Sequence, residues 1–416
     1  WFFMDRFEHF ATLLPSLVGN YEGPMSPPIV SSAAFGFGDA QTAEDIFSGA
    51  VQKPLYSRMG NPTTAKLEGV LAQIDGGVGA VAVSSGMAAI NLAVMGMVSA
   101  GDEIIAIGGL FGGTYALFTE TLNRFGVKTH FFDVDDHEKI EQAINEKTKV
   151  VFCEAVGNPN MRLPDLGHFG DLCARYKLCY IVDNTVTPIA VMPFEYGADM
   201  VVYSTTKLLS GSAHALGGAV VFRGIKDEDK FHDDKFSFLA PFIKKVGKMA
   251  LIPNAKKRVL RDMGFSANAF NSYMTLVGLE TLAIRSKRIF ENVEAVADGL
   301  FKEGFDVTHP SRSHHEHHKL YKKNFSYGCG PLLTVDMGNK ADAFALLDAM
   351  KRVFITVNIG DTRTLGVHTA STIYRDLDEA SRRYLGITDG LIRFSIGLES
   401  PADILEDFYQ ARATIK

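Results

Sequence analysis

The chain has 416 residues, of which 46% are hydrophobic and 22% are charged, so it has room for two or three domains and the composition of an ordinary globular protein. Its 42 basic and 48 acidic residues give a formal net charge of −6, which provides no overall positive field to attract nucleic acid or an anionic membrane. The four cysteines form no CxxC pair, so we expect a reduced, cytoplasmic protein without a disulfide framework or a metal site.

The first segment, residues 1–59, carries many Gly and Pro residues and shows little sustained periodicity. We therefore predict an extended arm with one short helix near residues 42–48. Because Asp5 and Arg6 soon interrupt the apolar start WFFM, no secretion signal is expected there. The longest apolar stretch, residues 88–98, is too short to cross a membrane.

The second segment, residues 60–262, alternates short apolar runs with helical patterns. Buried strands are predicted at runs such as VAVSS (81–85), DEIIAIGG (102–109), KVVFCEAV (149–156) and LCYIVDN (178–184). Alternation of this kind predicts an α/β fold, in which a mostly parallel sheet has helices on both faces.

The third segment, residues 263–416, begins with a long helical stretch predicted over residues 267–302. Further strands are predicted at PLLTVDM (331–337), FITVNIG (354–360) and LIRFSIG (391–397), and the chain ends in a helix. The segment is therefore expected to form a smaller C-terminal α/β domain.

Polar residues follow several of the predicted strands, at the edge where open α/β sheets bind ligands. Ser85, Gly86 and Met87 follow VAVS at the start of a helix, where free backbone N–H groups favour an anion such as phosphate. Asp183 ends another strand, and a carboxylate buried there needs a cationic partner.

Two more strand ends carry an amine and an amide. Lys207 follows the strand YSTT, and the alternation of Ser204 and Thr206 along that strand would place both hydroxyls on one face. Asn158 follows a third strand at a Gly-Asn-Pro turn. A phosphate site, an amine, a buried carboxylate and an amide together are what pyridoxal phosphate requires: the amine binds its aldehyde, the carboxylate keeps its ring nitrogen protonated and the amide binds its ring oxygen.

Seven sequence motifs carry a resemblance to a known family that covers roughly residues 27–400. They are PLYSRMGNPT, AVSSGMAAI, CEAVGNP, VDNT, YSTTKLLSG, GDTRTLGVHTAST and LIRFSIGLE. The chain resembles the pyridoxal phosphate enzymes of cysteine and methionine metabolism, which include cystathionine synthases and lyases, methionine γ-lyase and O-acetylhomoserine sulfhydrylase. The resemblance implies the fold type I of pyridoxal-phosphate-dependent transferases, with residues 60–262 as the cofactor-binding domain.

The resemblance also implies a role for individual residues. Lys207 would bind the cofactor covalently and transfer protons, Asp183 would pair with the ring nitrogen, and Asn158 would lie near the ring oxygen. Phosphate contacts are implied for Gly86, Met87, Ser204 and Thr206. Substrate contacts are implied for Arg393, which would grip the substrate carboxylate, and more weakly for Ser371. Thr185 and Thr372 match weaker pocket positions that are equally compatible with turns.

Tyr56 and Arg58 match residues that, in the family, reach the phosphate of a neighbouring subunit. This implies that the arm, residues 1–59, contacts a second copy of the chain. The implied assembly is a dimer that shares its active sites, commonly paired into a tetramer as a dimer of dimers.

One departure from the family concerns Phe111, which stands where many members have a tyrosine stacked on the cofactor ring. Phe111 can stack but has no acid or base to offer a leaving group. Acetate, whose conjugate acid has a pKa of about 4, needs protonation less than a thiol with a pKa of about 8.5. This favours an acylated homoserine as substrate, and NIGDTRTLGVHTAST (358–372) is most similar to the sulfhydrylase branch.

The predicted reaction replaces the γ-substituent of O-acetyl-L-homoserine with a sulfur nucleophile and gives homocysteine and acetate. The alternatives are a methionine γ-lyase, a cystathionine γ-synthase or lyase, and a non-catalytic protein that kept the fold. The sequence leaves open the choice between acetyl and succinyl and the identity of the sulfur donor.

Two other patterns suggest different chemistry and are set aside. The segment 77–82 fits a GxGxxA dinucleotide fingerprint, but it precedes a strand instead of following one. The histidine cluster at 314–318 would place His314 and His318 on one helix face, yet it lacks the HExxH order and a nearby third ligand. We interpret it as a solvated or mobile loop.

Overall fold

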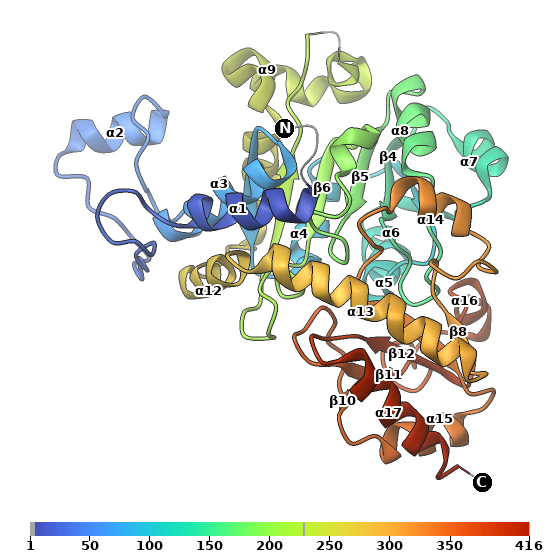
Figure 1. The fold of residues 1–416 in the computed structure, drawn as a ribbon. Coiled ribbons are helices and arrows are strands. Elements are labelled where there is room, and N and C mark those ends of the chain that lie inside the picture. Colours follow the sequence, from blue (N-terminus) through green and yellow to red (C-terminus); the bar gives the residue numbers. More distant parts are fainter. Residues whose placement is uncertain (1–4, 228, 416) are drawn as a thin grey trace.

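A seven-stranded sheet forms the centre of the first half of the chain in the computed structural model, which describes residues 5–227 and 229–415 (Figure 1). Its strands are β1 (Gly79–Val83), β2 (Glu103–Ile107), β3 (Lys128–Phe132), β4 (Thr148–Glu154), β5 (Cys179–Asp183), β6 (Met200–Tyr203) and β7 (Gly218–Phe222). They lie in the order β1-β7-β6-β5-β4-β2-β3. Only β7 runs antiparallel to its neighbours, so the prediction of a mostly parallel sheet is confirmed.

Helices cover both faces of this sheet because its strands are apolar on both sides. Val150 and Phe152 of β4 belong to one buried cluster with α4 (Gly86–Met95), whereas Val151 and Cys153 belong to another with α8 (Leu166–Arg175). Successive strand residues point to opposite faces. The remaining helices of this part are α3 (Pro62–Asp75), α5 (Gly112–Ala116), α6 (Leu122–Arg124), α7 (His137–Ala143), α9 (Ala240–Val246), α10 (Leu251–Ala255) and α11 (Arg261–Met263).

The C-terminal part contains a second, smaller sheet. Its strands are β8 (Asp306–Thr308), β9 (Leu332–Asp336), β10 (Phe354–Ile355), β11 (Leu365–His368) and β12 (Leu391–Ser395), in the order β10-β11-β12-β9-β8. Its helices are α14 (His318–Asn324), α15 (Lys340–Ala349), α16 (Glu379–Tyr384) and α17 (Pro401–Arg412). The predicted second α/β unit is therefore present.

The long connecting helix predicted over residues 267–302 is two helices, α12 (Ala269–Leu279) and α13 (Leu282–Lys302). The guanidinium of Arg285, in the first turn of α13, donates to the carbonyl oxygen of Gly278 at 2.6 Å and to that of Leu208 at 2.9 Å. Arg285 therefore ties both helices to the segment that follows Lys207.

The N-terminal segment differs in part from the predicted extended arm. The short helix expected near residues 42–48 is present as α2 (Ala40–Ser48), but Arg6–Val18 also form a helix, α1. Phe7, Phe10 and Leu14 of α1 recur at helical spacing and are buried, and α1 packs against α13, α12 and α3. Residues 1–4, the apolar start WFFM, lie outside the described residues.

The rest of the segment extends away from the body of the molecule together with α2 (Figure 1). Its apolar side chains are largely exposed, including 91% of Tyr21, 80% of Met25 and 70% of Phe47. Among the described residues, no helix combines the length and the apolar character that crossing a membrane demands.

Candidate active site

A cavity of about 280 Å³ lies at the carboxyl ends of β4, β5 and β6. Its lining residues are Ser85, Gly86, Met87, Ile90, Phe111, Glu154, Val156, Asn158, Asp183, Thr185, Val186, Ser204, Thr206, Lys207, Leu216, Val357, Ile359 and Arg393. The structure thus brings together residues that the sequence placed at separate strand ends, and Arg393 joins them from β12 of the C-terminal part.

One end of the cavity is built around the first turn of α4. The hydroxyl of Ser85 caps this helix by accepting the N–H of Ala88 at 3.1 Å, and the N–H groups of Gly86 and Met87 have no partner within the helix. A Cβ atom on Gly86 would lie 2.7 Å from Cβ of Ser204, so only glycine lets the two segments approach this closely. The helix start and the neighbouring hydroxyl form a cradle for a phosphate.

Ser204 and Thr206 line the cavity as predicted, but not for the predicted reason. The strand β6 ends at Tyr203, so both residues lie in the turn that follows and not on one strand face. The hydroxyl of Thr206 accepts the N–H of Gly217 at 3.0 Å, and Ser204 N–H donates to the hydroxyl of Thr185 at 2.8 Å. These bonds fix the turn that leads into Lys207.

Lys207 is a half-buried amine on the cavity wall. Its Nζ donates to Oδ1 of Asn358 at 2.8 Å. Burial and the nearby charge of Arg393 lower the pKa of Lys207 to about 8, because both disfavour the ammonium form. About a tenth of the amine is therefore neutral and nucleophilic at pH 7, far more than for an ordinary lysine.

Two carboxyl groups, Asp183 and Glu154, stand at the ends of neighbouring strands in direct register. Asp183 Oδ1 accepts the N–H of Thr185 at 2.9 Å, yet burial raises the pKa of Asp183 to about 6. Burial first, and then the charge of Asp183, raise the pKa of Glu154 well above its ordinary value. A cationic ring nitrogen bound here would lower the pKa of Asp183 again, as an opposite charge does.

Arg393 is almost fully buried, and its guanidinium is only partly satisfied. It donates to Oδ1 of Asn158 and to the carbonyl oxygen of Val357, both at 3.1 Å. Its buried Nε has no hydrogen-bond partner among the described residues. A buried donor left without a partner is costly. Arg393 lines the cavity, where its positive charge would attract a substrate carboxylate.

Three predicted residues do not line this cavity. The hydroxyl of Ser371 lies 2.7 Å from Nδ1 of His368. Tyr56 and Arg58 lie on the projecting arm, where Arg58 donates to the carbonyl oxygen of Arg261 at 2.5 Å. Of the weaker positions, Thr185 lines the cavity, whereas the hydroxyl of Thr372 donates to the carbonyl oxygen of His368 at 2.6 Å.

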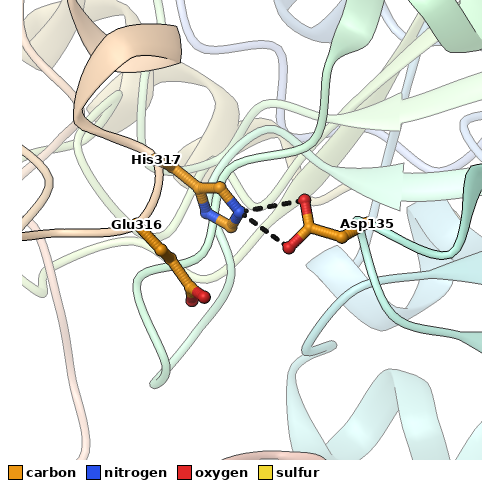
Figure 2. A group of neighbouring side chains, drawn as sticks. All are labelled: Asp135, Glu316 and His317. Carbon is orange, nitrogen blue, oxygen red and sulfur yellow. Dashed lines mark hydrogen bonds and ion pairs between the residues drawn. The ribbon is translucent and has the colours of Figure 1, made fainter.

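The histidine cluster is only in part the solvated loop that the sequence suggested, because residues 314–317 form a loop in which His314 and Glu316 are exposed but His317 is not. The helix α14 begins at His318, so His314 and His318 do not share a helix face. His317 is buried, and its Nδ1 accepts the N–H of Leu163 at 3.0 Å. Its Nε2 therefore carries a hydrogen and faces the carboxylate of Asp135 at 3.2 Å (Figure 2). A ring nitrogen that donates in this way is not a metal ligand.

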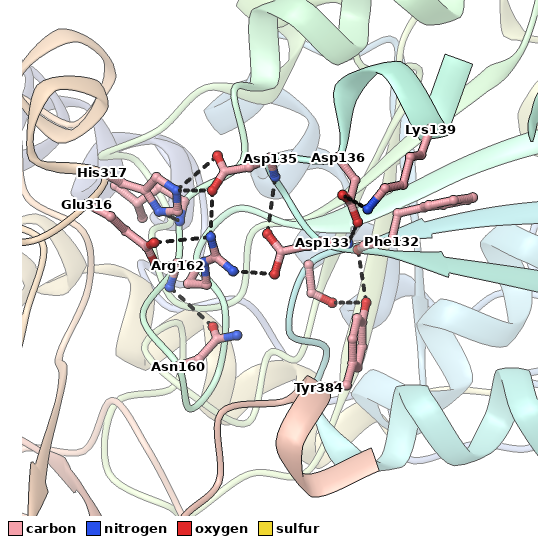
Figure 3. A network of polar contacts seen from close by, with 12 residues as sticks. Phe132, Asp133, Asp135, Asp136, Lys139, Asn160, Arg162, Glu316, His317 and Tyr384 are labelled. Carbon is pink, nitrogen blue, oxygen red and sulfur yellow. Dashed lines mark hydrogen bonds and ion pairs between the residues drawn. The ribbon is translucent and has the colours of Figure 1, made fainter. Parts of the chain in front are cut away.

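Arg162 lies among the carboxylates of the same cluster (Figure 3). Its guanidinium pairs with Asp133, with Oδ2 of Asp135 at 2.5 Å and with Oε1 of Glu316 at 2.8 Å. The guanidinium of Arg162 therefore already supplies the positive charge that a metal cation would bring to these carboxylates. The cluster is therefore an ion-pair network that ties the loops after β3 and β4 to the segment before α14.

Two residues with polar contacts at the site were not predicted from the sequence: Glu154, which lines the cavity, and Asn358, which contacts Lys207. Glu154 lies inside the predicted strand 149–156, whereas β4 ends at Glu154 itself. With the strand end placed correctly, the strand-end rule that selected Asp183 also selects Glu154. Asn358 lies between β10 and β11 and reaches Lys207 across the two parts of the chain. No local sequence pattern signals that approach.

The cavity fits pyridoxal phosphate. A helix start that suits a phosphate, an amine with a lowered pKa and a buried carboxylate surround one space beside a partly unsatisfied arginine. Lys207, Asp183 and the first turn of α4 are the residues that would hold the aldehyde, the ring nitrogen and the phosphate. The fold and the site together define an α/β enzyme of the pyridoxal-phosphate-dependent class.

The chain belongs to the family of Cys/Met metabolism PLP-dependent enzymes, whose sequence profile matches residues 18–413. It is 33% identical over 412 residues to a homocysteine/cysteine synthase of Saccharomyces cerevisiae, with 93% of each chain covered. It is 34% identical to an O-acetyl-L-homoserine sulfhydrylase of Corynebacterium glutamicum, covering 93% of this chain and 92% of that protein. The predicted family is confirmed.

A solved structure agrees with the fold as well. The chain superposes with a TM-score of 0.87 on a protein from Campylobacter jejuni that is assigned as an O-acetylhomoserine (thiol)-lyase, at 31% identity. The match covers 96% of this chain and 100% of that one, which carries N'-pyridoxyl-lysine-5'-monophosphate. The predicted fold and the predicted cofactor are therefore confirmed.

Proposed function

We propose that the protein replaces the γ-acetoxy group of O-acetyl-L-homoserine with a sulfur nucleophile, in a step of methionine biosynthesis that yields homocysteine and acetate. The observation that carries the proposal is Phe111 on the cavity wall, since its side chain has no acidic group to protonate a poor leaving group. Acetate leaves as a stable anion and does not need one. The names of the two relatives above point to the same chemistry.

Substrate binding rests on Arg393. Its guanidinium lines the cavity and suits the α-carboxylate of an amino acid, which a planar guanidinium binds through two hydrogen bonds. When bound, pyridoxal phosphate supplies an aldehyde that takes up an amino group and a ring that withdraws electrons from the substrate. Asp183 would hold the ring nitrogen in its protonated form, and Asn158 would bind the ring oxygen.

Proton transfer rests on Lys207. Its pKa of about 8 lets the neutral amine accept the α-proton of the substrate and then a β-proton, while Asn358 offers it a hydrogen-bond acceptor. The C–O bond at the γ-carbon then breaks with release of acetate, and a C–S bond forms there when sulfide adds. The two protons return to the α- and β-carbons.

We further propose that Tyr56 and Arg58 complete the phosphate site of a second copy of the chain. Support comes from their place on an arm that extends from the body of the molecule and has largely exposed apolar side chains (Figure 1). The assembly would be a dimer that shares its sites, paired into a cytoplasmic tetramer. Residues 1–59, 60–262 and 263–416 would be the arm, the cofactor domain and the C-terminal domain.

A product assay tests the proposed reaction. The purified holoenzyme is incubated with O-acetyl-L-homoserine, with and without sulfide, and homocysteine, acetate, 2-oxobutanoate and ammonia are measured. We expect homocysteine and acetate only when sulfide is present. Release of 2-oxobutanoate and ammonia regardless of sulfide would instead show a γ-lyase. The Lys207→Ala variant controls for reaction outside the site.

A further inference from the structure

Glu154 is the one carboxyl group of the cavity to which neither the sequence nor the proposed reaction gives a role. It ends β4 opposite Asp183, which ends β5. Residues in register on adjacent parallel strands point to the same face, so both side chains face the cavity that they line. Glu154 is 9% exposed and therefore buried.

The direct contact of Glu154 is with the backbone of Phe111. Its Oε1 accepts the N–H of Phe111 at 2.6 Å. Phe111 precedes α5 and has no side-chain cap there, and 38% of its surface is exposed. The bond to Glu154 therefore ties this partly exposed residue to the edge of the sheet.

The neighbourhood of the ring shows that its position is specific. A Cβ atom on Gly113 would lie 2.7 Å from Cε1 of Phe111 and 3.2 Å from Sδ of Met87. The ring thus folds back over the first turn of α5 into a space that only glycine leaves open. It lies beside Met87, at the phosphate end of the cavity.

The contact does not require a charged carboxylate. Two adjacent buried carboxyl groups repel each other when both are ionised, so one of the two holds a proton. Burial and the charge of Asp183 raise the pKa of Glu154 well above its ordinary range, which assigns the proton to Glu154. A neutral carboxyl still accepts the N–H of Phe111 through its carbonyl oxygen.

We propose that Glu154 is a positioning residue that fixes the backbone of Phe111 and, through it, the aromatic ring that would cover the cofactor. This inference rests on the proposed placement of the cofactor between Phe111 and the Lys207–Asp183 side of the cavity. Glutamine retains the acceptor and the size of Glu154, whereas leucine retains only the size.

The test compares Glu154→Gln with Glu154→Leu in the full-length protein. Two quantities are measured: the dissociation constant of pyridoxal phosphate and the visible circular dichroism of the bound cofactor, which reports how the ring is held. We expect Glu154→Gln to keep the dissociation constant of pyridoxal phosphate within about threefold of the wild-type value and to preserve the circular dichroism. Leucine is expected to weaken binding about tenfold and to change the dichroism, as loss of one buried hydrogen bond does.

A double-mutant cycle tests whether Glu154 influences cofactor binding through Phe111. If Glu154 acts through Phe111, then Glu154→Leu adds less than about threefold to the loss caused by Phe111→Leu. Fully additive losses would overturn the proposal, as would wild-type affinity and dichroism in Glu154→Leu. Should the leucine variant fail to fold, Glu154→Ser takes its place, because serine is too short to reach the N–H of Phe111.

The same protein preparations show whether an unexpected result comes from a wrong cofactor site or from a wrong role for Glu154. If Lys207→Ala retains the covalent absorbance of the wild type, the cofactor is placed wrongly, and the inference about Glu154 falls with that placement. If Lys207→Ala loses this absorbance while Glu154→Leu matches the wild type, the cofactor site stands and only the inference is wrong. The product assay is independent of both results.

Discussion

Lys207 combines two conditions that a reactive lysine needs, partial burial and a neighbouring positive charge. Burial and the charge of Arg393 lower its pKa to about 8. An ordinary lysine has a pKa of about 10.4 and is almost fully protonated at neutral pH. The amine in this site is thus prepared for covalent chemistry before any ligand arrives.

The lowered pKa predicts how fast the cofactor attaches at different pH values. Only the neutral amine attacks an aldehyde, so the rate of covalent attachment to the apoprotein should rise with pH and level off above a midpoint near 8. Stopped-flow absorbance of pyridoxal phosphate mixed with apoprotein measures this midpoint. The Arg393→Met variant removes the neighbouring charge and should shift the midpoint upward. A midpoint near 10 in the wild type would contradict the assignment.

At the level of single residues, the sequence predicted most of one wall of the cavity. Asp183, Asn158, Gly86 and Lys207 were found because each follows a strand, and strand ends share one edge of a sheet. Asn358 was not found, since its approach to Lys207 depends on how the C-terminal part packs on the large sheet.

At the level of elements, a buried polar contact joins the end of α3 to β6. Asp75 closes α3, and the hydroxyl of Tyr203 donates to its Oδ1 at 2.7 Å. Burial raises the pKa of Asp75 to about 7, whereas an aspartate in the unfolded chain titrates near 3.9. The folded protein therefore binds a proton at Asp75 that the unfolded chain releases at much lower pH.

The stability of the fold should depend on pH because of this residue. Protonated Asp75 makes its full contribution to the free energy of unfolding below about pH 4. This contribution is lost as the pH rises through about 7. Asp75→Asn keeps the shape and removes the titration, so its stability relative to the wild type should grow by on the order of 3 kcal/mol between pH 4 and 8. Urea unfolding at both pH values measures the difference. Equal pH dependence in the two proteins would show that Asp75 does not titrate in this range.

The elements themselves were predictable where the pattern was regular. Strands that are apolar on both sides, such as β4 and β5, appear in the sequence as short runs of apolar residues bounded by turn residues. The structure confirms these strands. The helix α1 was missed because Pro15 interrupts its pattern and Gly and Pro residues follow it. Its burial against α13 outweighs these local signals.

At the level of the whole molecule, the arm with α2 has little to pack against in a single chain (Figure 1). Its exposed side chains include Tyr21, Met25 and Phe47. A surface of this kind favours contact with another protein surface, and Tyr56 and Arg58 lie on the same arm. The shared active site proposed above accounts for both features.

Subunit complementation tests this sharing. Arg58→Ala and Lys207→Ala chains should each be nearly inactive alone. When they are refolded together in equal amounts, half of the dimers are hybrids, and each hybrid has one site with both native residues. We therefore expect roughly a quarter of the wild-type specific activity. Activity no higher than the sum of the separate variants would contradict the shared site.

The central claim is that the amine of Lys207 binds pyridoxal phosphate covalently. Borohydride reduction of the holoenzyme fixes that bond, and mass spectrometry of the digested protein then locates the phosphopyridoxyl group. The account predicts the added mass on the peptide that contains Lys207 and its loss in Lys207→Ala. The modification on a different lysine, with the Lys207 peptide unmodified, would contradict it.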